Sequence, residues 1–368
     1  MPRISVIRNR MGIHMKQYKY KYIFEELQSE IINGKYMKSG KLPTEEILAN
    51  HFDVSRQTIR QAIMMLEKAG IVSRRQGSGT YILPPLAKDN YDRTVAVIST
   101  YIEGYIFPSM IRGISDVLTK KRFTLSLFAT NNCVSEERVV LKTLLLSCPA
   151  GIIVDATKSA LPNPNIDLYK QLIHNNVPIV FINGCYPELE NETISVVMDD
   201  DEGGYMLTKY LYEHGHSKIA GIFKSDDIQG PKRYGGYVRC HLDFGISFQD
   251  NSVRWYSDPS RIEALLDNQE HFLNYIRKHT ALICYNEEIA IPLLQFLQKQ
   301  NIYVPKDLAV CSFDNSSASD ITPIKITSLN HPKDRLGNLA ATKLLHLIMG
   351  RKEISETMKW TIVEKESC

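Results

Sequence analysis

Three polar side chains in one short segment have the chemistry that reads DNA bases. The segment SRQTIRQAI, residues 55–63, contains Arg56, Gln57 and Arg60. At about 100° per residue on a helix, these three side chains lie within about 100° of arc on one side. The opposite side carries apolar residues: Ile59, Ala62 and Leu66. Because arginine can bind guanine bidentately and glutamine can bind adenine, the segment predicts a recognition helix in the major groove.

The start of this helix also favours a phosphate. The hydroxyls of Ser55 and Thr58, with the free backbone amides of the first turn, can hold a phosphate of the DNA backbone. An isolated Arg-Gln-x-x-Arg pattern is more typical of a solvated helix face. The neighbouring elements therefore decide the interpretation.

Those elements predict three helices followed by a hairpin. Apolar spacing predicts a helix over residues 20–32 and a second over 44–51, whose first turn the hydroxyl of Thr44 can cap. The recognition helix is expected to end at Gly70. Two short β-type runs, residues 71–75 and 80–83, follow it, and the Gly-containing link between them favours a tight hairpin.

A second group of polar residues follows apolar runs further along the chain. From Thr94 onward, strand-like runs alternate with helical segments, which predicts an α/β fold with parallel sheets covered by helices. Ligands of open α/β sheets bind at the carboxyl ends of the strands. The polar residues at these expected ends are Asn131, Asn132, Asp155, Asn183, Asp199, Asp200, Lys224, Asn286 and Asp314. For any single one of them, capping of the next helix is an equally good explanation.

The composition is that of a globular protein with two or three domains. Of 368 residues, 43% are hydrophobic and 23% charged, and no apolar run approaches the roughly 20 residues of a membrane-spanning helix. Seven cysteines without metal-type spacing favour reduced thiols in the cytoplasm, and no secretory signal is visible.

The net charge of +3 is unevenly distributed. Residues 1–86 hold 14 Lys and Arg against 7 Asp and Glu, whereas the rest of the chain has a balance of −4. A basic head on a mildly acidic body suits a protein that binds nucleic acid.

About forty contiguous residues match one family pattern in order. The matching residues are Pro43, Glu45, Leu48, Ala49, Phe52, Val54, Ser55, Arg56, Thr58, Arg60, Ala62, Leu66, Gly70 and the run from Arg75 to Thr80. The segment thereby resembles the winged helix-turn-helix of the GntR family of bacterial regulators. The resemblance implies that operator bases or phosphates are contacted by Glu45, Arg56, Gln57 and Arg60, and that Gln76 and Gly77 form the wing tip. Because one such module buries little surface, a homodimer on palindromic operator DNA is expected.

The body of the chain matches a different family. The motifs are VAVIST with YIFPSMIRGI, DDxxGG at 199–204, HGHSKIAGI at 214–222, KRYGGY at 232–237, ALICYNEEIA at 281–290, VPKDLAVCSFD at 304–314 and ITSLNHPKDRLG at 326–337. They resemble the ligand-binding core of the LacI/GalR regulators, which has the two-lobed fold of the type I periplasmic binding proteins. A GntR head on such a core is similar to the arabinose-responsive repressors of Gram-positive bacteria. This resemblance implies a repressor that L-arabinose releases from DNA, without a cofactor.

The two resemblances divide the chain into four expected parts. They are a flexible arm (1–15), the winged helix-turn-helix (16–83), a polar linker (84–93) and a two-lobed sugar-binding and dimerisation domain (94–368).

The second resemblance also implies which residues bind the sugar. Arg233 stands where LacI-type cores place a sugar-binding arginine, Asn286 and Asp314 match two strand-end ligands, and His331 matches a hinge-side polar ligand. Further candidates on expected cleft loops are Tyr105, Phe107, Asn132, Asp155, Lys158 and Asn183. Planar bidentate groups and an aromatic wall suit the vicinal hydroxyls and the ring of a pentose.

Several alternatives stay open at this point. The effector could be another sugar or a purine, since LacI-type cores accept both. An enzyme acting on sugars is disfavoured because no nucleophile elbow, Walker loop, acid–base pair or zinc signature is present, so no catalytic or metal site is expected. A solute receptor is disfavoured by the head. The His214-Gly215-His216 run is expected to form a turn.

Overall fold

The computed structural model describes residues 19–32, 35–36, 39–69, 71–75, 78–82, 93–247, 249–257 and 269–368. The chain divides into two compact units, Met1–Asp92 with Lys142–Cys148, and Arg93–Leu141 with Pro149–Cys368. Among the described residues, no helix combines the length and the apolarity needed to cross a membrane.

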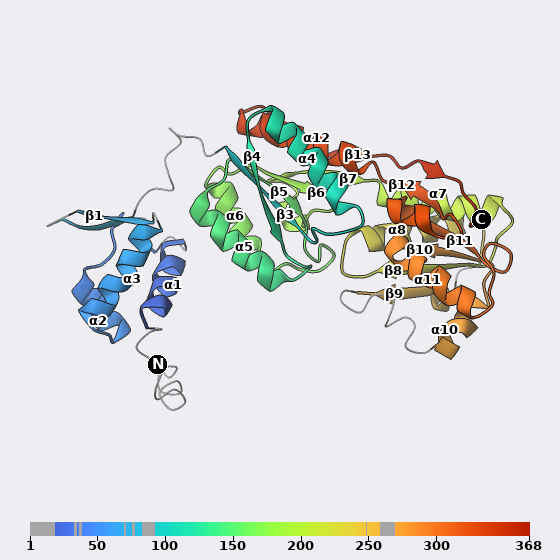
Figure 1. The fold of residues 1–368 in the computed structure, drawn as a ribbon, viewed down its shortest axis with the longest axis horizontal. Coiled ribbons are helices and arrows are strands. Elements are labelled where there is room, and N and C mark those ends of the chain that lie inside the picture. The colour runs from blue at the N-terminus through green and yellow to red at the C-terminus, as the bar shows by residue number, and fades with distance from the viewer. Residues whose placement is uncertain are drawn as a thin grey trace. The chain divides into compact units, whose positions relative to one another are not determined.

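The first unit packs three helices against each other and adds a two-stranded hairpin (Figure 1). Its elements are α1 (Lys19–Ile32), α2 (Glu45–Phe52), α3 (Arg56–Lys68), β1 (Val72–Arg75) and β2 (Gly79–Ile82). The side chains that α3 gives to the core include Ile59, Ala62 and Leu66, and all three are fully buried. The predicted apolar face of the recognition helix is therefore confirmed.

Side-chain hydroxyls fix the starts of α2 and α3. Thr44 Oγ1 accepts a hydrogen bond from the amide of Ile47 at 3.4 Å, which confirms the predicted cap. Ser55 Oγ accepts one from the amide of Thr58 at 3.3 Å. Between the helices, Asp53 has a φ of 51° and turns the chain sharply, so α3 begins three residues later.

The hairpin is short, as its glycine pattern predicts. Arg75 pairs with Gly79 across the two strands, and Val72 pairs with Ile82. Other expectations fall outside the described residues: the wing-tip residues Gln76 and Gly77, the helix stop at Gly70, the arm of residues 1–15, and linker residues 84–92.

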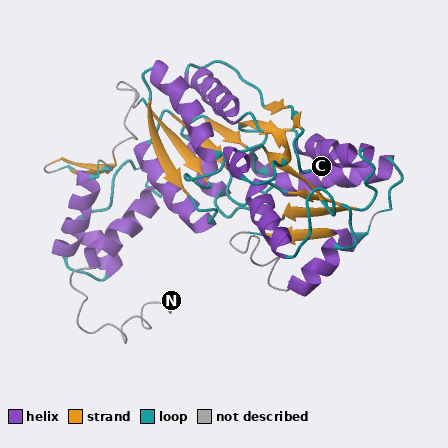
Figure 2. Cartoon of the chain, turned by 45° about the vertical axis from the view of Figure 1, so that its right-hand side comes forward, coloured by secondary structure: helices purple, strands orange, loops and turns teal. Residues whose placement is uncertain are grey.

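The second unit contains two six-stranded sheets in its described residues, and each has helices beside it (Figure 2). The sheet of the first lobe has the order β13-β7-β6-β5-β3-β4 and that of the second lobe β14-β12-β11-β10-β8-β9. The first set is β3 (Thr94–Ser99), β4 (Thr124–Ala129), β5 (Gly151–Asp155), β6 (Ile179–Ile182), β7 (Ile194–Met198) and β13 (Glu356–Met358). The second set is β8 (Ile219–Lys224), β9 (Val253–Tyr256), β10 (Ala281–Cys284), β11 (Ala309–Asp314), β12 (Thr327–Asn330) and β14 (Ile362–Val363).

Neighbouring strands run parallel in both sheets except for the antiparallel pair of β12 and β14. The expected α/β fold of parallel sheets is confirmed. The central strands are buried because helices shield both faces: β5 is buried along its whole length, and so is β11.

The helices in the described residues of this unit connect successive strands. They are α4 (Phe107–Lys120), α5 (Val134–Ser147), α6 (Ile166–His174), α7 (Asp200–Glu213), α8 (Gln229–Asp243), α10 (Gln269–Ile276), α11 (Glu287–Lys299) and α12 (Lys333–Ile348). Figure 1 shows α4 and α12 side by side, and close packing at Gly113 and Gly337 explains why both are glycine, since a Cβ at either would collide with the other helix. After α7, His214 and Gly215 form the turn that the sequence predicts.

Three chain crossings join the two lobes. The chain passes from β7 to α7, from β12 to α12, and from β13 to β14, and each step leads from one sheet to the other lobe. The carboxyl ends of the parallel strands of both sheets therefore meet near these crossings, which is where polar residues can face a ligand.

Candidate functional site

The exposed face of α3 presents the three predicted base-reading side chains. Arg56, Gln57 and Arg60 are all exposed, as expected from their helical spacing. Arg60 makes a bidentate pair with Glu45 of α2, with Nε to Oε1 at 3.3 Å and Nη2 to Oε2 at 2.9 Å. Arg56 pairs with Glu46 at 2.5 Å. The guanidiniums are therefore held by carboxylates that lie on the surface and can be exchanged for another anion.

The start of α3 and the hairpin add further polar groups to this unit. Ser55 and Thr58 hydroxyls lie 2.9 Å apart at the first turn. In the hairpin, Arg75 and Lys41 stack over the ring of Tyr81 at 4.7 and 4.4 Å. Neither cation was predicted from the sequence to be a contact, although Arg75 belongs to the motif shared with the GntR family.

A pocket lies at the carboxyl ends of the strands of both lobes in the second unit. Its volume is about 770 Å³, part of which is open to solvent. Eight of the ten predicted sugar-binding residues line it: Tyr105, Phe107, Asn132, Asp155, Asn183, Arg233, Asn286 and Asp314. The structure therefore brings together residues that are up to 209 positions apart in sequence, as the hydrogen bond from Tyr105 to Asp314 illustrates.

The left-handed backbone explains why asparagine and aspartate occupy the strand ends. Asn132, Asn183 and Asp314 have φ angles of 53°, 63° and 88°. Their short polar side chains tolerate this conformation better than branched or bulky ones do. The chain turns abruptly at these positions and the polar group stays at the pocket instead of joining a helix.

Arg233 is the most enclosed charged group of the site. Its guanidinium is 1% exposed and lies over the rings of Phe313 and Tyr285, at 4.1 and 4.6 Å from their centroids. Nε donates to Asp200 at 2.9 Å, Nη1 donates to the carbonyl of Tyr285 at 2.5 Å, and Nη2 lies 3.7 Å from Asp314. These contacts hold the plane of the guanidinium in one orientation at the pocket.

Arg233 and Asp200 each shift the pKa of the other. Burial alone would lower the pKa of Arg233, but the nearby carboxylates of Asp200 and Asp314 outweigh it and raise that pKa. Burial raises the pKa of Asp200 to about 6 against the opposing charge of Arg233. Each charge favours the charged form of its partner, so the two groups form an ion pair inside the protein.

The first lobe contributes a carboxylate with directed partners. Asp155 at the end of β5 accepts hydrogen bonds from the amide and hydroxyl of Thr100 and from Asn183 Nδ2, the last at 2.9 Å. Burial raises the pKa of Asp155, while these hydrogen bonds lower it. The side-chain oxygen of Asn183 is buried and has no hydrogen-bond partner among the described residues, so an acceptor points into the site unused.

Side chains from opposite lobes meet across the pocket. The hydroxyl of Tyr105 donates to the carboxylate of Asp314 and accepts from the amide of Glu287 at 3.3 Å. On the other side, Asn132 Nδ2 donates to Asp226 at 3.3 Å. The two lobes are thus in direct contact at both ends of the pocket.

Two predicted ligand residues are not part of the pocket wall. Lys158 donates its backbone amide to Asn132 Oδ1 at 2.9 Å, so it supports a wall residue without lining the pocket itself. His331 is 2% exposed and packs its ring edge-on against Trp360 at the crossing from β12 to α12. Neither ring nitrogen has a hydrogen-bond partner among the described residues, and burial lowers the pKa of His331 to about 4.

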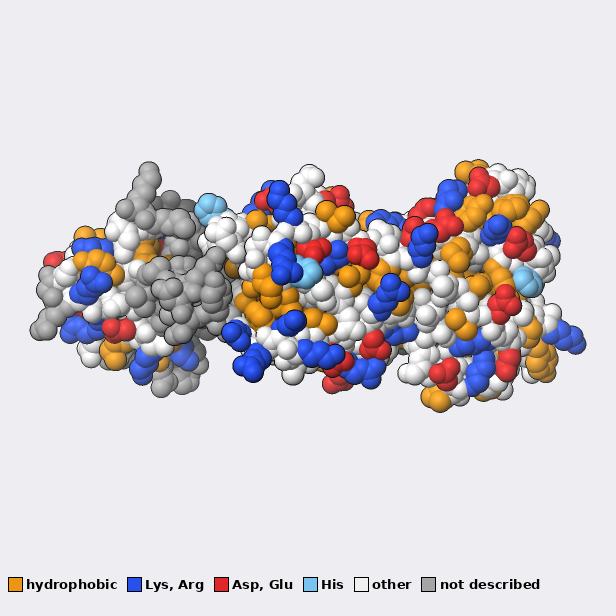
Figure 3. All heavy atoms as spheres, turned by 90° about the horizontal axis from the view of Figure 1, so that it is seen from above, with side chains coloured by type: hydrophobic (Ala, Val, Ile, Leu, Met, Phe, Trp, Pro, Cys, Tyr) orange, Lys and Arg blue, Asp and Glu red, His pale blue; other side chains and the backbone are white. Residues whose placement is uncertain are grey.

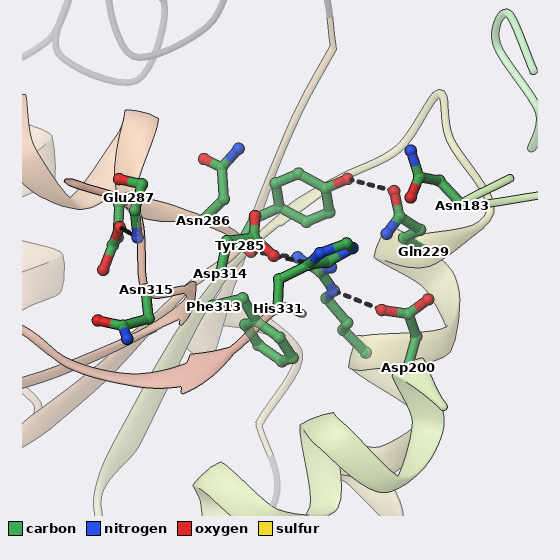
Figure 4. Close-up of polar contacts among 12 residues, drawn as sticks. Asn183, Asp200, Gln229, Tyr285, Asn286, Glu287, Phe313, Asp314, Asn315 and His331 are labelled. Atoms are coloured by element: carbon green, nitrogen blue, oxygen red, sulfur yellow. Dashed lines mark hydrogen bonds and ion pairs between the residues drawn. The ribbon is translucent and has the colours of Figure 1, made fainter. Parts of the chain in front are cut away.

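The pocket contains polar residues that were not predicted from the sequence as sugar ligands. Lys224, Asp227, Gln229 and Tyr285 all line it, and the Tyr285 hydroxyl donates to Asp227 at 2.6 Å. Figure 4 shows Tyr285 between Asn286 on one side and Gln229 on the other. Lys224 ends β8 and was among the polar residues predicted at strand ends. Tyr285 directly follows β10, so the same rule would have found it as well. Asp227 lies in the loop before α8, and Gln229 lies in the first turn of that helix. Neither follows a strand directly, so the rule does not select them.

The comparisons with known proteins cover both units. Residues 19–82 match the family model of bacterial regulatory proteins, gntR family, and residues 208–368 match that of the periplasmic binding protein-like domain. The "Arabinose metabolism transcriptional repressor" of Geobacillus stearothermophilus is 37% identical over 90% of this chain and 92% of its own length. The protein of the same name from Halalkalibacterium halodurans is 35% identical over 94% and 93%. Among solved structures, the transcription regulator CcpA of Lactococcus lactis is similar with a TM-score of 0.66 and 26% identity, over 74% of this chain and 98% of its own.

Proposed function

This chain belongs to the family of arabinose metabolism transcriptional repressors, and we propose that it binds palindromic operator DNA as a homodimer and leaves it when L-arabinose fills the pocket. In this proposal residues 16–83 read the DNA, residues 84–93 link the parts, and residues 94–368 bind the sugar and form the dimer. The protein acts in the cytoplasm, where the operator is.

The composition of the pocket wall is the observation that carries the proposed sugar binding. The exposed arginines of α3 support the proposed DNA binding. Carboxylates, amides and a fixed guanidinium surround one space together with aromatic rings. Such planar groups accept or donate pairs of hydrogen bonds, which matches vicinal hydroxyls, while a ring face matches the apolar side of a sugar. The unused oxygen of Asn183 is an acceptor for one hydroxyl.

The release mechanism follows from contacts between the lobes. A sugar in the pocket touches residues of both lobes and therefore favours the arrangement in which Tyr105 meets Asp314 and Asn132 meets Asp226. A ligand shifts an equilibrium only by its difference in affinity for the two arrangements. We propose that the lobes pivot at the three chain crossings and that this movement changes the spacing of the two heads of a dimer. Couplings of about 1–3 kcal/mol are common for such switches.

The test measures DNA binding by the full chain with and without sugar. An operator duplex is retained in a gel-shift assay, and L-arabinose is expected to release it while D-xylose is not. Asp155→Asn should weaken the response to L-arabinose because it removes a buried acceptor, with DNA binding unchanged. The matched control is Asp116→Asn, an exposed residue of α4 outside the pocket wall. A complex that ignores every pentose contradicts the effector, and absence of a complex contradicts the DNA binding.

A second effector class is favoured by one observation. Tyr101, Phe107 and Tyr285 place aromatic rings around the pocket, and such rings can stack on a purine as well as on a sugar. Hypoxanthine and D-galactose therefore belong in the same assay. Release by one of these in place of L-arabinose would keep the regulator and change its ligand.

We propose further that the protein binds its effector without converting it. The family to which it belongs consists of transcriptional repressors. Incubation of the purified protein with L-arabinose, followed by chromatographic analysis, should return the sugar unchanged. A new product would contradict this part of the proposal.

A further inference from the structure

The amino-terminal end of the first lobe's sheet carries a group of basic side chains. The basal basic cluster consists of Arg93, Lys120, Lys121 and Arg122, and all four are exposed. No acidic side chain within 4.0 Å pairs with any of them in the part of the chain that the structure describes. Unpaired surface cations of this density attract a polyanion.

The fold brings the four residues together from two segments. Arg93 precedes β3, and its carbonyl accepts a hydrogen bond from the amide of Thr124 at 2.8 Å, in the first residue of β4. Arg122 reverses the chain with a φ of 61° between α4 and β4. The cluster therefore lies where α4 ends beside the starts of two neighbouring parallel strands.

A second basic pair lies at the same end of the lobe. Arg351 and Lys352 follow α12, and both are exposed. Near its end α12 packs Ile348 against Gly151 at the start of β5, and Gly151 pairs with Val95 of β3. Figure 3 shows Lys and Arg side chains gathered beside a hydrophobic patch on the face that carries α4 and α12.

This concentration of charge contrasts with the rest of the body. Residues after 86 have a net charge of −4, so a group of six cations at one end differs from the charge of the body as a whole. The acidic residue Glu353 follows Lys352 and pairs with Lys343 and His346. Glu190 and Glu192 precede β7, which is three strands away from β3 and thus about 14 Å. Positive charges at the carboxyl end of a helix also stabilise it by their interaction with the helix dipole. That effect accounts for Lys120 but not for Arg93, which precedes a strand.

Chain connectivity limits how far this end of the lobe can lie from the end of the first unit. Eleven residue steps separate Ile82, the end of β2, from Arg93. A fully extended chain of that length spans at most about 40 Å. One helical turn of DNA is about 34–36 Å long. The length of the chain between Ile82 and Arg93 therefore allows the basal basic cluster to reach the duplex that flanks the operator.

We propose that the basal basic cluster binds backbone phosphates of the duplex that flanks the operator. This rests on the proposed DNA binding by the first unit and adds a second contact, made by the lobe that binds the effector. The contact does not depend on base sequence, because guanidinium and ammonium groups meet only phosphates there. It also brings the first lobe into direct contact with the DNA, and a movement of one lobe against the other can weaken that contact.

The test compares two duplexes and two variants of the full chain. One duplex carries the operator alone, and the other extends it by one helical turn on each side. K120Q/K121Q/R122Q is expected to lower affinity for the extended duplex on the order of tenfold at low salt, and to reduce the slope of log K against log salt by about 0.9 per lost phosphate contact. Affinity for the short duplex should stay unchanged.

The matched control removes three exposed cations from the second lobe. R277Q/K299Q/K306Q has the same change in net charge and should behave like the wild type on both duplexes. Unchanged affinity and salt slope of K120Q/K121Q/R122Q on the extended duplex would overturn the contact, as would an equal loss in the control. Failure of the wild type to bind either duplex would instead contradict the proposed function. Retained sugar binding by both variants shows that they are folded.

Discussion

Two arginine–carboxylate pairs, one in each unit, have similar chemistry and opposite surroundings. Arg60 and Glu45 on the first unit have side chains that are 59% and 31% exposed. Arg233 and Asp200 in the second unit are 1% and 2% exposed, and aromatic rings cover the guanidinium. Both pairs have an N–O distance of 2.9 Å. Distance alone therefore does not distinguish their roles.

The difference lies in what each pair can exchange. An exposed ion pair gains little because water solvates both charges, so Glu45 can give up Arg60 to a base or a phosphate at low cost. A buried pair has already lost its hydration, and removing one partner leaves the other charge uncompensated. We infer that the first unit uses its pair as an exchangeable contact, whereas the second unit uses its pair to fix the shape of a binding site.

Removing Arg233 should produce the largest effect. Arg233→Ala leaves Asp200 and Asp314 without their cation, and we expect the free energy of unfolding to fall by about 3–5 kcal/mol. Denaturant titration of the full chain measures this. The matched control is Arg239→Ala on the same helix, whose exposed pair with Asp201 should contribute less than about 1 kcal/mol. Equal effects of the two changes would contradict the contrast between buried and exposed pairs.

Acid should destabilise the second unit through His331. Its pKa in the folded protein is about 4, below the ordinary value near 6.5. Between these pH values the unfolded chain binds more protons, so the free energy of unfolding falls as the pH decreases from 6.5 to 4, by at most about 3 kcal/mol. Asp200, with a pKa raised to about 6, acts in the opposite direction.

His331→Gln isolates the contribution of the histidine because glutamine does not titrate. The variant and the wild type are compared by denaturant titration at pH 7.5, 6 and 4.5. As the pH falls, the free energy of unfolding of the wild type should decrease more than that of the variant. A difference between the two that is the same at all three pH values would show that His331 is not buried as a neutral ring.

The sequence predicts the parts of these two sites that depend on local pattern. Helical spacing placed Ile59 inside and Arg60 outside, and strand ends located Asp155, Asn183 and Asp314 at the pocket. These succeed because burial follows a period of 3.6 in helices and because parallel strands end at one edge. The contact between Glu45 and Arg60 does not follow from spacing within a helix, since it joins two helices.

The sequence could not predict the contacts made by the segments in which the chain crosses from one lobe to the other. Strands β13 and β14 are three and two residues long, too short for a periodic signal, yet they lie on opposite sheets. Trp360 between them reaches Arg233, with its ring 5.4 Å from the guanidinium. His331 lies in another crossing, from β12 to α12. It was expected at the pocket wall, but it is buried against Trp360 instead. Only tertiary packing decides such positions.

The exposed pair offers a test with a smaller effect on folding and a specific effect on DNA. Arg60→Ala should reduce affinity for the operator roughly tenfold to a hundredfold and relax the preference for the base that Arg60 contacts. Its stability and its affinity for L-arabinose should match the wild type because the side chain packs against no core residue. Competition assays with operator variants measure the change. A uniform loss on all sequences would indicate a phosphate contact.

The smallest expected effect comes from the carboxylate beside Arg56. Glu46 is 65% exposed and lies 2.5 Å from Arg56, so its negative charge competes with DNA for that guanidinium and repels nearby phosphates. Glu46→Gln keeps the shape and removes the charge, and we expect affinity for DNA to increase by a factor of about two to five. The gain should shrink as salt is raised, because screening weakens surface charges. Decreased affinity would show that Glu46 orients Arg56 for its contact, which would make this exposed pair resemble the buried one.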